Sequence, residues 1–251
     1  MRIVFLDVAY RQYDFKSELI SIRTALESLS KYIDMSVMDL DDYLLNYGLI
    51  VNLENSNKLH NSLISYGSDK GASNNFPMLY SSIIDNLTAR VPSIKILEVG
   101  LGTNNVDIES NMGTFGNPGA SVRAFRDYVR STDQIFGADI DERILFSEPR
   151  IKTMHVDQLN IKSLVNIADT LGEIDLIIDD GLHILESNLN TVFALLPNIR
   201  IGGFYVVEDI ANHPENIISW HLLSNNLKKQ GFTSEIVHIT GSIIFVMKRE
   251  K

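Results

Sequence analysis

The sequence predicts a doubly wound α/β fold in which a mostly parallel sheet ends in an antiparallel hairpin. From residue 94 onward, short and nearly continuous apolar runs alternate with stretches of helical periodicity. Such runs indicate parallel strands with helices on both faces of the sheet. Near the end of the chain, "FTSEIVHITGSIIFVMKR" divides into two strand-like halves at Thr240 and Gly241, which is typical of a β-hairpin.

The expected elements follow the chain in a regular order. The apolar runs of this Rossmann-like sheet are "IKILEVG", "QIFGADI", "IKTMHV", "IDLIIDD" and "GGFYVVEDI", and a helix over residues 216–230 precedes the hairpin. Before Pro92, helical patterns in "SELISIRTALESLSKYI" and "MLYSSIIDNLTARV" flank the polar loop "SYGSDKGASNNFP". We therefore expect a mainly helical N-terminal extension, residues 1–92, that reaches the ligand cleft, and a ligand-binding domain, residues 93–251.

Composition and charge exclude several classes of partner. The chain has 251 residues, of which 45% are apolar and 22% are charged, as in an ordinary globular protein. A net charge of -10 gives no general attraction to nucleic acid or to anionic membranes, so neither is expected as a partner. Without cysteine there is no disulfide or thiolate metal site, and no signal peptide or membrane span is visible. The expected location is the cytoplasm.

The turn "EVGLGTNN" follows the first apolar run, where an open α/β sheet binds its ligand. Glycine lets the backbone approach that ligand closely. A dinucleotide fingerprint needs a third glycine where Asn105 stands, and the carboxylate of Glu98 would face a pyrophosphate. S-Adenosylmethionine carries a sulfonium and an ammonium but no phosphate, so it suits Glu98, Gly100 and Gly102 better. The alternative is a tight turn that binds nothing.

Two further strand ends supply polar groups for the same ligand. Asp139 ends "IFGADI", where a carboxylate can accept hydrogen bonds from both ribose hydroxyls. Asp157 and Gln158 follow "IKTMHV" and can read the amino group and ring nitrogens of adenine. Either of these two is equally suited to capping a helix, and Asp141 ranks below Asp139 as a contact for the same reason.

Acidic residues and one histidine gather at the ends of the fourth and fifth strands. The segments "IIDDGLH" and "VVEDI" supply Asp179, Asp180, His183, Glu208 and Asp209. Carboxylates at one rim repel each other unless a cation lies between them, which predicts a Mg²⁺ site, or a Mn²⁺ site, held by Asp180, Glu208 and Asp209. Asp179 is closer to the strand and either serves the cofactor or holds the loop. The alternative is that these acids only turn the chain and cap helices.

His183 is the predicted general base. It follows Asp180 by three residues in the same loop, and an imidazole ordinarily titrates near neutral pH. The expected reaction transfers the methyl group of S-adenosylmethionine to a hydroxyl of an acceptor molecule. In the expected mechanism, Mg²⁺ binds this acceptor hydroxyl or a vicinal diol and lowers its pKa. His183 removes the proton while the oxygen attacks the methyl carbon, and the sulfonium leaves as a neutral thioether.

The pattern resembles the S-adenosylmethionine-dependent, Mg²⁺-dependent O-methyltransferases that act on sugars of natural products, such as the mycinamicin and novobiocin sugar methyltransferases. The matching segments are "GSDKG", "ILEVGLGTNN", "NPGASVRAFRDY", "IFGADIDERILF", "IKTMHVDQ", "LIIDDGLH" and "GGFYVVEDI", which together cover residues 66–210. The resemblance implies a small-molecule acceptor, a sugar or a glycosylated metabolite. It also implies the roles of metal ligands for Asp180, Glu208 and Asp209, of base for His183, and of cofactor contacts for Glu98, Gly100, Asp139, Asp157 and Gln158.

One departure from the family concerns the acceptor. After "GSDKG" the family often has a histidine and then a tyrosine, whereas this chain has Asn74 and Phe76. If these side chains touch the acceptor, its identity differs. In the family the N-terminal segment shapes the acceptor site or the oligomer, so a homo-oligomer is also implied. Two other classes stay open: a nicotinamide-dependent oxidoreductase and a noncatalytic ligand-binding protein on the same fold.

Overall fold

The computed structural model describes residues 20, 23–26, 28–32, 35–72 and 75–251. The first expected helical pattern, residues 17–33, lies partly outside these described residues, and Asn74 lies wholly outside them. Within the described part of the chain, no helix is long and apolar enough to cross a membrane.

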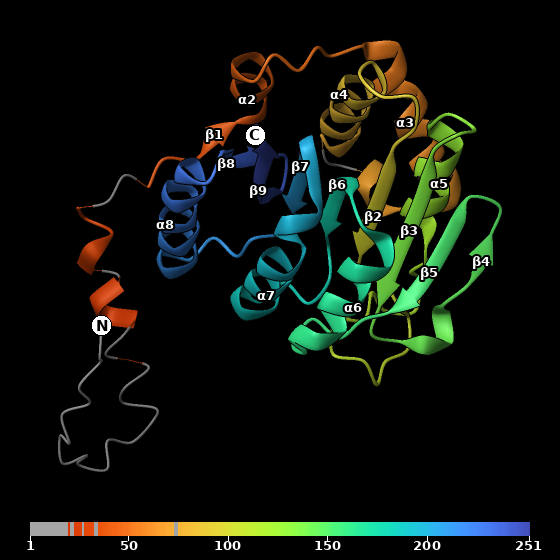
Figure 1. The fold of residues 1–251 in the computed structure, drawn as a ribbon. Coiled ribbons are helices and arrows are strands. Elements are labelled where there is room, and N and C mark those ends of the chain that lie inside the picture. Colours follow the sequence, from red (N-terminus) through yellow and green to blue (C-terminus); the bar gives the residue numbers. More distant parts are fainter. Residues whose placement is uncertain (1–19, 21–22, 27, 33–34, 73–74) are drawn as a thin grey trace.

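A nine-stranded sheet lies at the centre of the described structure (Figure 1). Its strand order is β1-β8-β9-β7-β6-β2-β3-β5-β4. The strands are β1 (Met38–Asp39), β2 (Lys95–Val99), β3 (Gln134–Asp139), β4 (Ser147–Glu148), β5 (Ile151–His155), β6 (Ile174–Asp179), β7 (Ile199–Val207), β8 (Phe232–Ile239) and β9 (Ser242–Arg249). The run from β7 to β5 is parallel, whereas β9 pairs antiparallel with β7 and β8. The predicted sheet and its terminal hairpin are confirmed.

Helices cover both faces of this sheet (Figure 1). One buried cluster joins the sheet to α2 (Leu40–Asn46), α3 (Leu53–Tyr66), α4 (Phe76–Thr88) and α5 (Ala120–Tyr128). A second cluster joins the other face to α6 (Ile161–Leu171), α7 (Leu185–Leu195) and α8 (Pro214–Lys229). In β6, Leu176 and Ile178 belong to the first cluster and Ile177 to the second. Because alternate side chains point to opposite faces and both faces are covered, the strand is apolar throughout.

Local signals in the sequence set the ends of the helices near the site. The side chain of Asn52 accepts hydrogen bonds from the amides of Glu54 and Asn55 and so caps the start of α3. Gly67, with φ of 76°, ends the same helix in the left-handed conformation. Immediately after it, Asp69–Gly71 form a single 3-10 turn, η1, which leads the chain back toward the sheet.

The helices of the expected extension share their core with the sheet. Leu59 of α3 and Tyr80 of α4 are fully buried in the same cluster as Ile96 of β2 and Phe125 of α5. At the edge of the sheet, β1 pairs parallel with β8. A boundary at residue 92 therefore cuts a continuous core, and the division into residues 1–92 and 93–251 stays a proposal.

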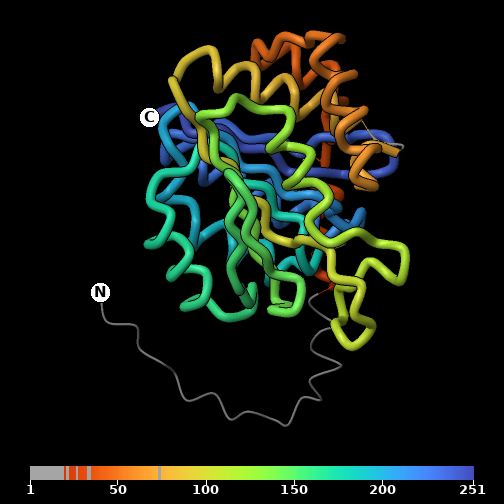
Figure 2. The backbone as a smooth tube through the Cα atoms, turned by 90° about the vertical axis from the view of Figure 1, so that its right-hand side faces the viewer, coloured from red at the N-terminus to blue at the C-terminus, as the bar shows by residue number. Residues whose placement is uncertain are grey.

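The connection from β2 to α5 is long and has no regular secondary structure. Residues 103–118 extend beyond the carboxyl ends of the strands, where the yellow and yellow-green loops project from the body in Figure 2. Asp141 anchors the start of this segment, since its Oδ2 accepts hydrogen bonds from Thr103 Oγ1 at 2.6 Å and from Asn105 Nδ2 at 2.7 Å. The loop is thus tied to the end of β3.

Candidate active site

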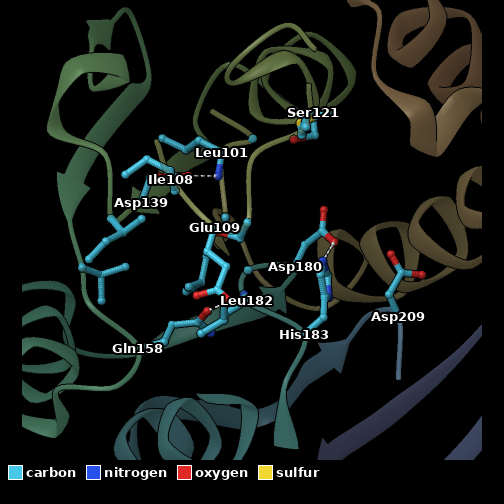
Figure 3. Close-up of a pocket in the computed structure, with 18 of the residues that line it drawn as sticks. Leu101, Ile108, Glu109, Ser121, Asp139, Gln158, Asp180, Leu182, His183 and Asp209 are labelled. Carbon is cyan, nitrogen blue, oxygen red and sulfur yellow. Dashed lines mark hydrogen bonds and ion pairs between the residues drawn. The ribbon is translucent and has the colours of Figure 1, made fainter. Parts of the chain in front are cut away.

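A cavity of about 320 Å³ opens at the carboxyl ends of β2, β3, β5 and β6 (Figure 3). These strands flank the point where the chain order of the sheet reverses, which is where open α/β sheets bind ligands. Residues 107–110 and Met112 of the long loop form part of the wall. Acidic side chains prevail in the lining, with one lysine, Lys70, beside Asp69, Asp107, Glu109, Asp139, Asp157, Asp180 and Asp209.

The two glycines of the predicted turn line this cavity. Gly100 has φ of 98°, and a Cβ built on it would lie 2.0 Å from the backbone oxygen of Asp180. Gly102 has φ of 75°, and its Cβ would meet the sulfur of Met112. Gly100 therefore needs glycine for conformation and for space, whereas Gly102 needs it for conformation, because the flexible Met112 side chain could move away from a Cβ. The predicted turn thus lines the cavity, and its contact with a cofactor stays a prediction.

Asp139 lies at the cavity wall as predicted. Its Oδ2 accepts a hydrogen bond from the amide of Leu101 at 2.7 Å, and its Oδ1 accepts one from the amide of Asp141 at 2.9 Å. A carboxylate has about four acceptor positions, so two backbone amides leave capacity for a ligand. These amides fix the carboxylate in one orientation at the end of β3.

Apolar side chains line the cavity together with Asp139 and Asp157. Ile140, Leu159 and Leu182 line it, and Ile140 and Leu159 are 40% and 50% exposed. Asp157 is half-buried, and its Oδ1 accepts a hydrogen bond from the amide of Leu159. Apolar walls with a few placed carboxylates suit a flat heteroaromatic ring joined to a sugar. Sequence reasoning missed the three apolar residues, because an apolar residue after a strand carries no sign of its exposure.

Gln158 and Asp179 are joined by a hydrogen bond, and of the two only Gln158 lines the cavity. The amide nitrogen of Gln158 donates hydrogen bonds to Asp179 Oδ1 at 2.7 Å and to Thr191 Oγ1 at 2.9 Å. Its oxygen accepts a hydrogen bond from the amide of Leu182. Gln158 still contributes to the lining, but Asp179 is fully buried, and burial raises its pKa to about 6. Asp179 thus contacts Gln158 and does not line the cavity, and its predicted role as a cofactor contact stays a prediction.

Glu98 lies beneath the cavity. Its side chain is fully buried and accepts a hydrogen bond from Ser121 Oγ. Its other oxygen, Oε1, is 3.5 Å from Lys70 Nζ and makes no hydrogen bond within the described part of the chain. Burial raises the pKa of Glu98 to about 7. The structure therefore places this predicted cofactor contact behind the lining, where it borders Lys70.

Lys70 and Tyr80 are two site residues that sequence reasoning missed. Lys70 in η1 is 3% exposed, and its ammonium pairs with Asp180 and Glu208. Burial alone would lower the pKa of Lys70, but attraction by Asp180, Glu208 and Glu98 outweighs burial and raises it. Tyr80 in α4 is fully buried, and its hydroxyl donates a hydrogen bond to Glu208. A lysine inside the motif "GSDKG" was the available signal.

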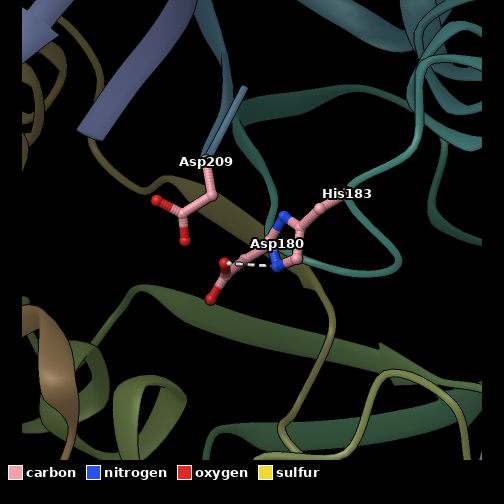
Figure 4. Close-up of side chains that lie close together, drawn as sticks. All are labelled: Asp180, His183 and Asp209. Atoms are coloured by element: carbon pink, nitrogen blue, oxygen red, sulfur yellow. Dashed lines mark ion pairs between the residues drawn. The ribbon is translucent and has the colours of Figure 1, made fainter. Parts of the chain in front are cut away.

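Asp180, His183 and Asp209 meet at one end of the cavity (Figure 4). One ligand atom from each lies within 4.8 Å of the others, and His183 Nε2 is 3.6 Å from Asp180 Oδ1. His183 and Asp209 have φ of 56° and 51°, in the left-handed region that most residues avoid. Backbone strain of this kind is found at functional sites, where the surrounding structure holds it in place.

The donor set fits a divalent cation. Two carboxylates and an imidazole, close enough to contact one ion, suit Mn²⁺, and the carboxylate oxygens suit Mg²⁺. Of the predicted ligands, Asp180 and Asp209 come together. Glu208 is 1% exposed, with one oxygen on Lys70 Nζ at 2.9 Å and the other on the Tyr80 hydroxyl. Its role as a ligand stays a prediction.

Phe76, which departs from the family pattern, lies beside Lys70 and Tyr80 and does not line the cavity. It is buried, and its ring centroid is 5.6 Å from Lys70 Nζ and 5.8 Å from the ring of Tyr80. In this arrangement Phe76 supports Lys70 and does not line the cavity.

Comparison with known proteins supports the resemblance. No family model matches the chain. The chain is 31% identical over 147 residues to the 8-demethyl-8-alpha-L-rhamnosyl tetracenomycin-C 2'-O-methyltransferase of Streptomyces olivaceus, covering 59% of this chain and 36% of that protein. It is 34% identical over 125 residues to the mycinamicin VI 2''-O-methyltransferase of Micromonospora griseorubida, covering 48% of this chain and 28% of that protein. The matched region is thus about a third of each relative's length.

A solved structure extends the likeness to the fold. The MycE methyltransferase of mycinamycin biosynthesis, in complex with Mg, SAH and mycinamycin VI, matches with a TM-score of 0.59 and 21% identity, covering 97% of this chain and 65% of that one. At this identity the match shows a shared fold. Together with the sequence relatives, it confirms that this chain resembles the sugar O-methyltransferases, as its motifs predict.

Proposed function

We propose that this protein transfers the methyl group of S-adenosylmethionine to a hydroxyl of a sugar on a small glycosylated metabolite. One observation carries the proposal: the ligand cavity ends at the Asp180, His183 and Asp209 cluster, so a methyl donor and an acid–base centre would share one site. The relatives named above act as sugar O-methyltransferases, which agrees with this assignment.

The cavity lining supports a cationic methyl donor. Asp139 would accept hydrogen bonds from the ribose hydroxyls, Ile140 and Leu159 would cover the adenine, and Asp157 would accept a hydrogen bond from its amino group; all four residues line the cavity. The turn at Gly100 and Gly102 would let the methionine portion approach the backbone. With acidic residues prevailing around the cavity, a sulfonium is attracted and the pyrophosphate of a nicotinamide cofactor is repelled. This favours methyl transfer over the oxidoreductase alternative.

The chain's own residues supply the remaining chemistry. Asp180 and Asp209 would hold Mg²⁺, the metal in the MycE structure, and Mn²⁺ would fit the same donors. When bound, the metal supplies Lewis-acid polarisation of the acceptor hydroxyl. His183 takes the hydroxyl proton as the oxygen attacks the methyl carbon. The carbon–sulfur bond breaks as the carbon–oxygen bond forms, and the sulfur keeps the electron pair as a neutral thioether.

Binding of S-adenosylhomocysteine tests the cofactor assignment. Replacing Asp139 by Ala should weaken this binding by about 1.5–3 kcal/mol, the usual contribution of hydrogen bonds to a charged group. Isothermal calorimetry with S-adenosylhomocysteine and with NAD measures the effect. Glu142→Ala is the matched control, because Glu142 is an exposed carboxylate on the same loop that does not line the cavity. Tighter binding of NAD than of S-adenosylhomocysteine would reject the proposal.

Removal of metal tests the proposed metal site. Dialysis against a chelator should abolish transfer of a labelled methyl group to rhamnosyl and other deoxysugar glycosides, and Mg²⁺ or Mn²⁺ should restore it. Asp180→Asn and Asp209→Asn should each reduce the restored rate. Full turnover by thoroughly metal-stripped protein would show that the carboxylates act without a metal. Binding of S-adenosylhomocysteine without turnover on any glycoside would favour the noncatalytic alternative.

The remaining expectations belong to the same proposal. Residues before 66 are proposed to shape the acceptor site or a homo-oligomer, and light scattering of the full chain measures the oligomeric state. The cytoplasm is the proposed location. The glycoside panel used for the metal experiment also identifies the acceptor, because its members differ in the sugar hydroxyls they offer.

A further inference from the structure

Residues 103–112 form a closed loop beside the cavity. The amide of Met112 donates a hydrogen bond to the carbonyl oxygen of Thr103 at 2.8 Å, so the two ends of the loop lie together. Between these ends, residues 107–110 line the cavity (Figure 3). A compact surface loop of this kind is held at its base, where its ends meet. Whatever fixes Thr103 therefore also places this wall of the cavity.

Asp141 fixes the base of the 103–112 loop from the end of β3. It is 3% exposed and does not line the cavity. Its Oδ2 accepts hydrogen bonds from Thr103 Oγ1 at 2.6 Å and from Asn105 Nδ2 at 2.7 Å. Its own amide donates to Asp139 Oδ1 at 2.9 Å. The carboxylate proposed to bind the ribose is thus joined through the backbone to the residue that holds the loop.

Arg143 connects the same carboxylate to the part of the loop that lines the cavity. Its Nε donates to Asp141 Oδ1 at 2.6 Å and its Nη2 to Asp141 Oδ2 at 3.0 Å, a paired contact that orients the guanidinium. The same Nη2 donates to Asp107 Oδ1 at 3.1 Å. The side chains of Arg143 and Asp107 are 51% and 66% exposed, so their ion pair is open to water and salt.

The size of the cavity requires this wall to move when a ligand is exchanged. Its volume of about 320 Å³ is at the lower end for ligand sites, which bury most of the surface of what they hold. The contacts of Asp141 are costly to break, because they would leave a buried carboxylate without its donors. The pair between Arg143 and Asp107 is exposed and therefore weak, so it can break and form again.

We propose that Asp141 and Arg143 are positioning residues for the cofactor. Asp141 keeps the base of the 103–112 loop in place, and the Arg143–Asp107 pair opens when the cofactor enters or leaves and closes over the bound cofactor. This inference rests on the proposed function, because it takes S-adenosylmethionine as the ligand of the cavity. It adds three residues, Asp107, Asp141 and Arg143, to those that determine how the cofactor is held.

Dissociation of S-adenosylhomocysteine from the full chain, measured by surface plasmon resonance, tests the Arg143–Asp107 pair. Asp107→Asn should raise the dissociation rate about two- to fivefold, the range for an exposed ion pair, and Arg143→Gln should raise it at least as much. In the parent the rate should increase with NaCl, and this increase should be smaller in both variants. Glu142→Gln is the matched control, because it removes an exposed carboxylate that does not line the cavity.

A double-mutant cycle separates the ion pair from a direct contact between Asp107 and the cofactor. Asp107 lines the cavity and Arg143 does not, so only Asp107 could act by touching the ligand. When Arg143→Gln is already present, Asp107→Asn should change the dissociation rate by less than about 1.5-fold, because its partner is gone. An equal effect of Asp107→Asn in both backgrounds would overturn the role of the pair.

Cleavage by a glutamate-specific protease tests Asp141 without any ligand. Glu109 lies in the loop, and cleavage of a native protein requires local unfolding around the cut. Asp141→Asn should speed the cut after Glu109 about tenfold or more, as measured by mass spectrometry. The cut after the exposed Glu173, outside the loop, should keep its parental rate, whereas a general loss of stability would speed both.

The Asp141→Asn variant should also weaken S-adenosylhomocysteine binding about tenfold, although the backbone amide that supports Asp139 is retained. Thr103→Val removes one donor of the loop and leaves Asp141 unchanged, so it should speed the cut after Glu109 as well. This second variant decides the role of the anchor if Asp141→Asn does not fold.

The outcomes separate this inference from the function on which it rests. Parental cleavage after Glu109 in Thr103→Val and in a folded Asp141→Asn protein would overturn the role of Asp141. A parental dissociation rate in Arg143→Gln would overturn the role of the ion pair while leaving the proposed function standing. A parent protein that binds no S-adenosylhomocysteine would overturn the proposed function and this inference together.

Discussion

Replacement of His183 by Ala is expected to lower the rate of methyl transfer by about 10²–10⁴-fold, the usual contribution of a general base. The imidazole is 35% exposed at the end of the cavity, with Nε2 3.6 Å from Asp180 Oδ1, so it can reach an acceptor oxygen held at the cluster. Single-turnover transfer of a labelled methyl group measures the loss. The affinity for S-adenosylhomocysteine should stay nearly parental, because His183 lies in the proposed metal cluster and is not among the proposed cofactor contacts.

The backbone of His183 calls for a second variant. With φ of 56°, an Ala at this position adds strain that Asn tolerates better. His183→Asn should therefore lose activity to the same extent as His183→Ala while keeping the parental loop. Near-parental turnover in His183→Asn would mean that the histidine is not the base. A Mn²⁺ affinity that falls as much as in Asp209→Asn would instead make His183 a metal ligand.

Gly100→Ala is expected to lower the free energy of unfolding by about 3 kcal/mol or more and to abolish S-adenosylhomocysteine binding. The added Cβ would lie 2.0 Å from the carbonyl oxygen of Asp180 and 2.5 Å from its carbonyl carbon. Both are backbone atoms that cannot move without displacing the loop that carries Asp180. Urea denaturation measures the stability, and calorimetry measures the binding.

Gly113→Ala separates the clash from the conformational effect of replacing a glycine. Gly113 also has a positive φ, 72°, but a Cβ there meets no atom within 4 Å. Its replacement should cost about 1 kcal/mol, the lower end of the range for a left-handed residue, and leave cofactor binding intact. Equal losses in the two variants would show that the contact with Asp180 is unimportant.

The sequence predicted the sheet and the cavity because both depend on local patterns. Strands covered on both faces must be apolar throughout, as Leu176, Ile177 and Ile178 illustrate. The carboxyl ends of parallel strands meet at one edge, so Asp139, Asp180 and Asp209 had to approach the same cleft. Gly100 followed from the glycine-containing turn directly after the first apolar run.

The orientation of each side chain was not predictable in the same way. At the end of a strand, a shift of one residue decides whether a carboxylate faces the ligand or the core. Glu98 and Asp179 precede residues that line the cavity by one or two positions, and both are fully buried. Lys70 and Tyr80 precede β2 in the chain, and their pairing with Glu208 is a tertiary contact that no periodicity signals.

Lys70 lies before β2 in the chain, and this position also limits where two such proteins can be joined in a chimera. A chimera joined at residue 92 would inherit Lys70 and Tyr80 from one parent and Glu208 from the other. The hydrogen bonds between them would then form only if the two parents carry compatible residues at these positions. Helix α3 should travel with the sheet as well, because Tyr66 and Ser62 hydrogen bond to α5 residues Asp127 and Ala124. A crossover between α2 and α3, in residues 47–52, would keep the charged centre and its scaffold from one parent, while the buried side chains of α2 would come from the other.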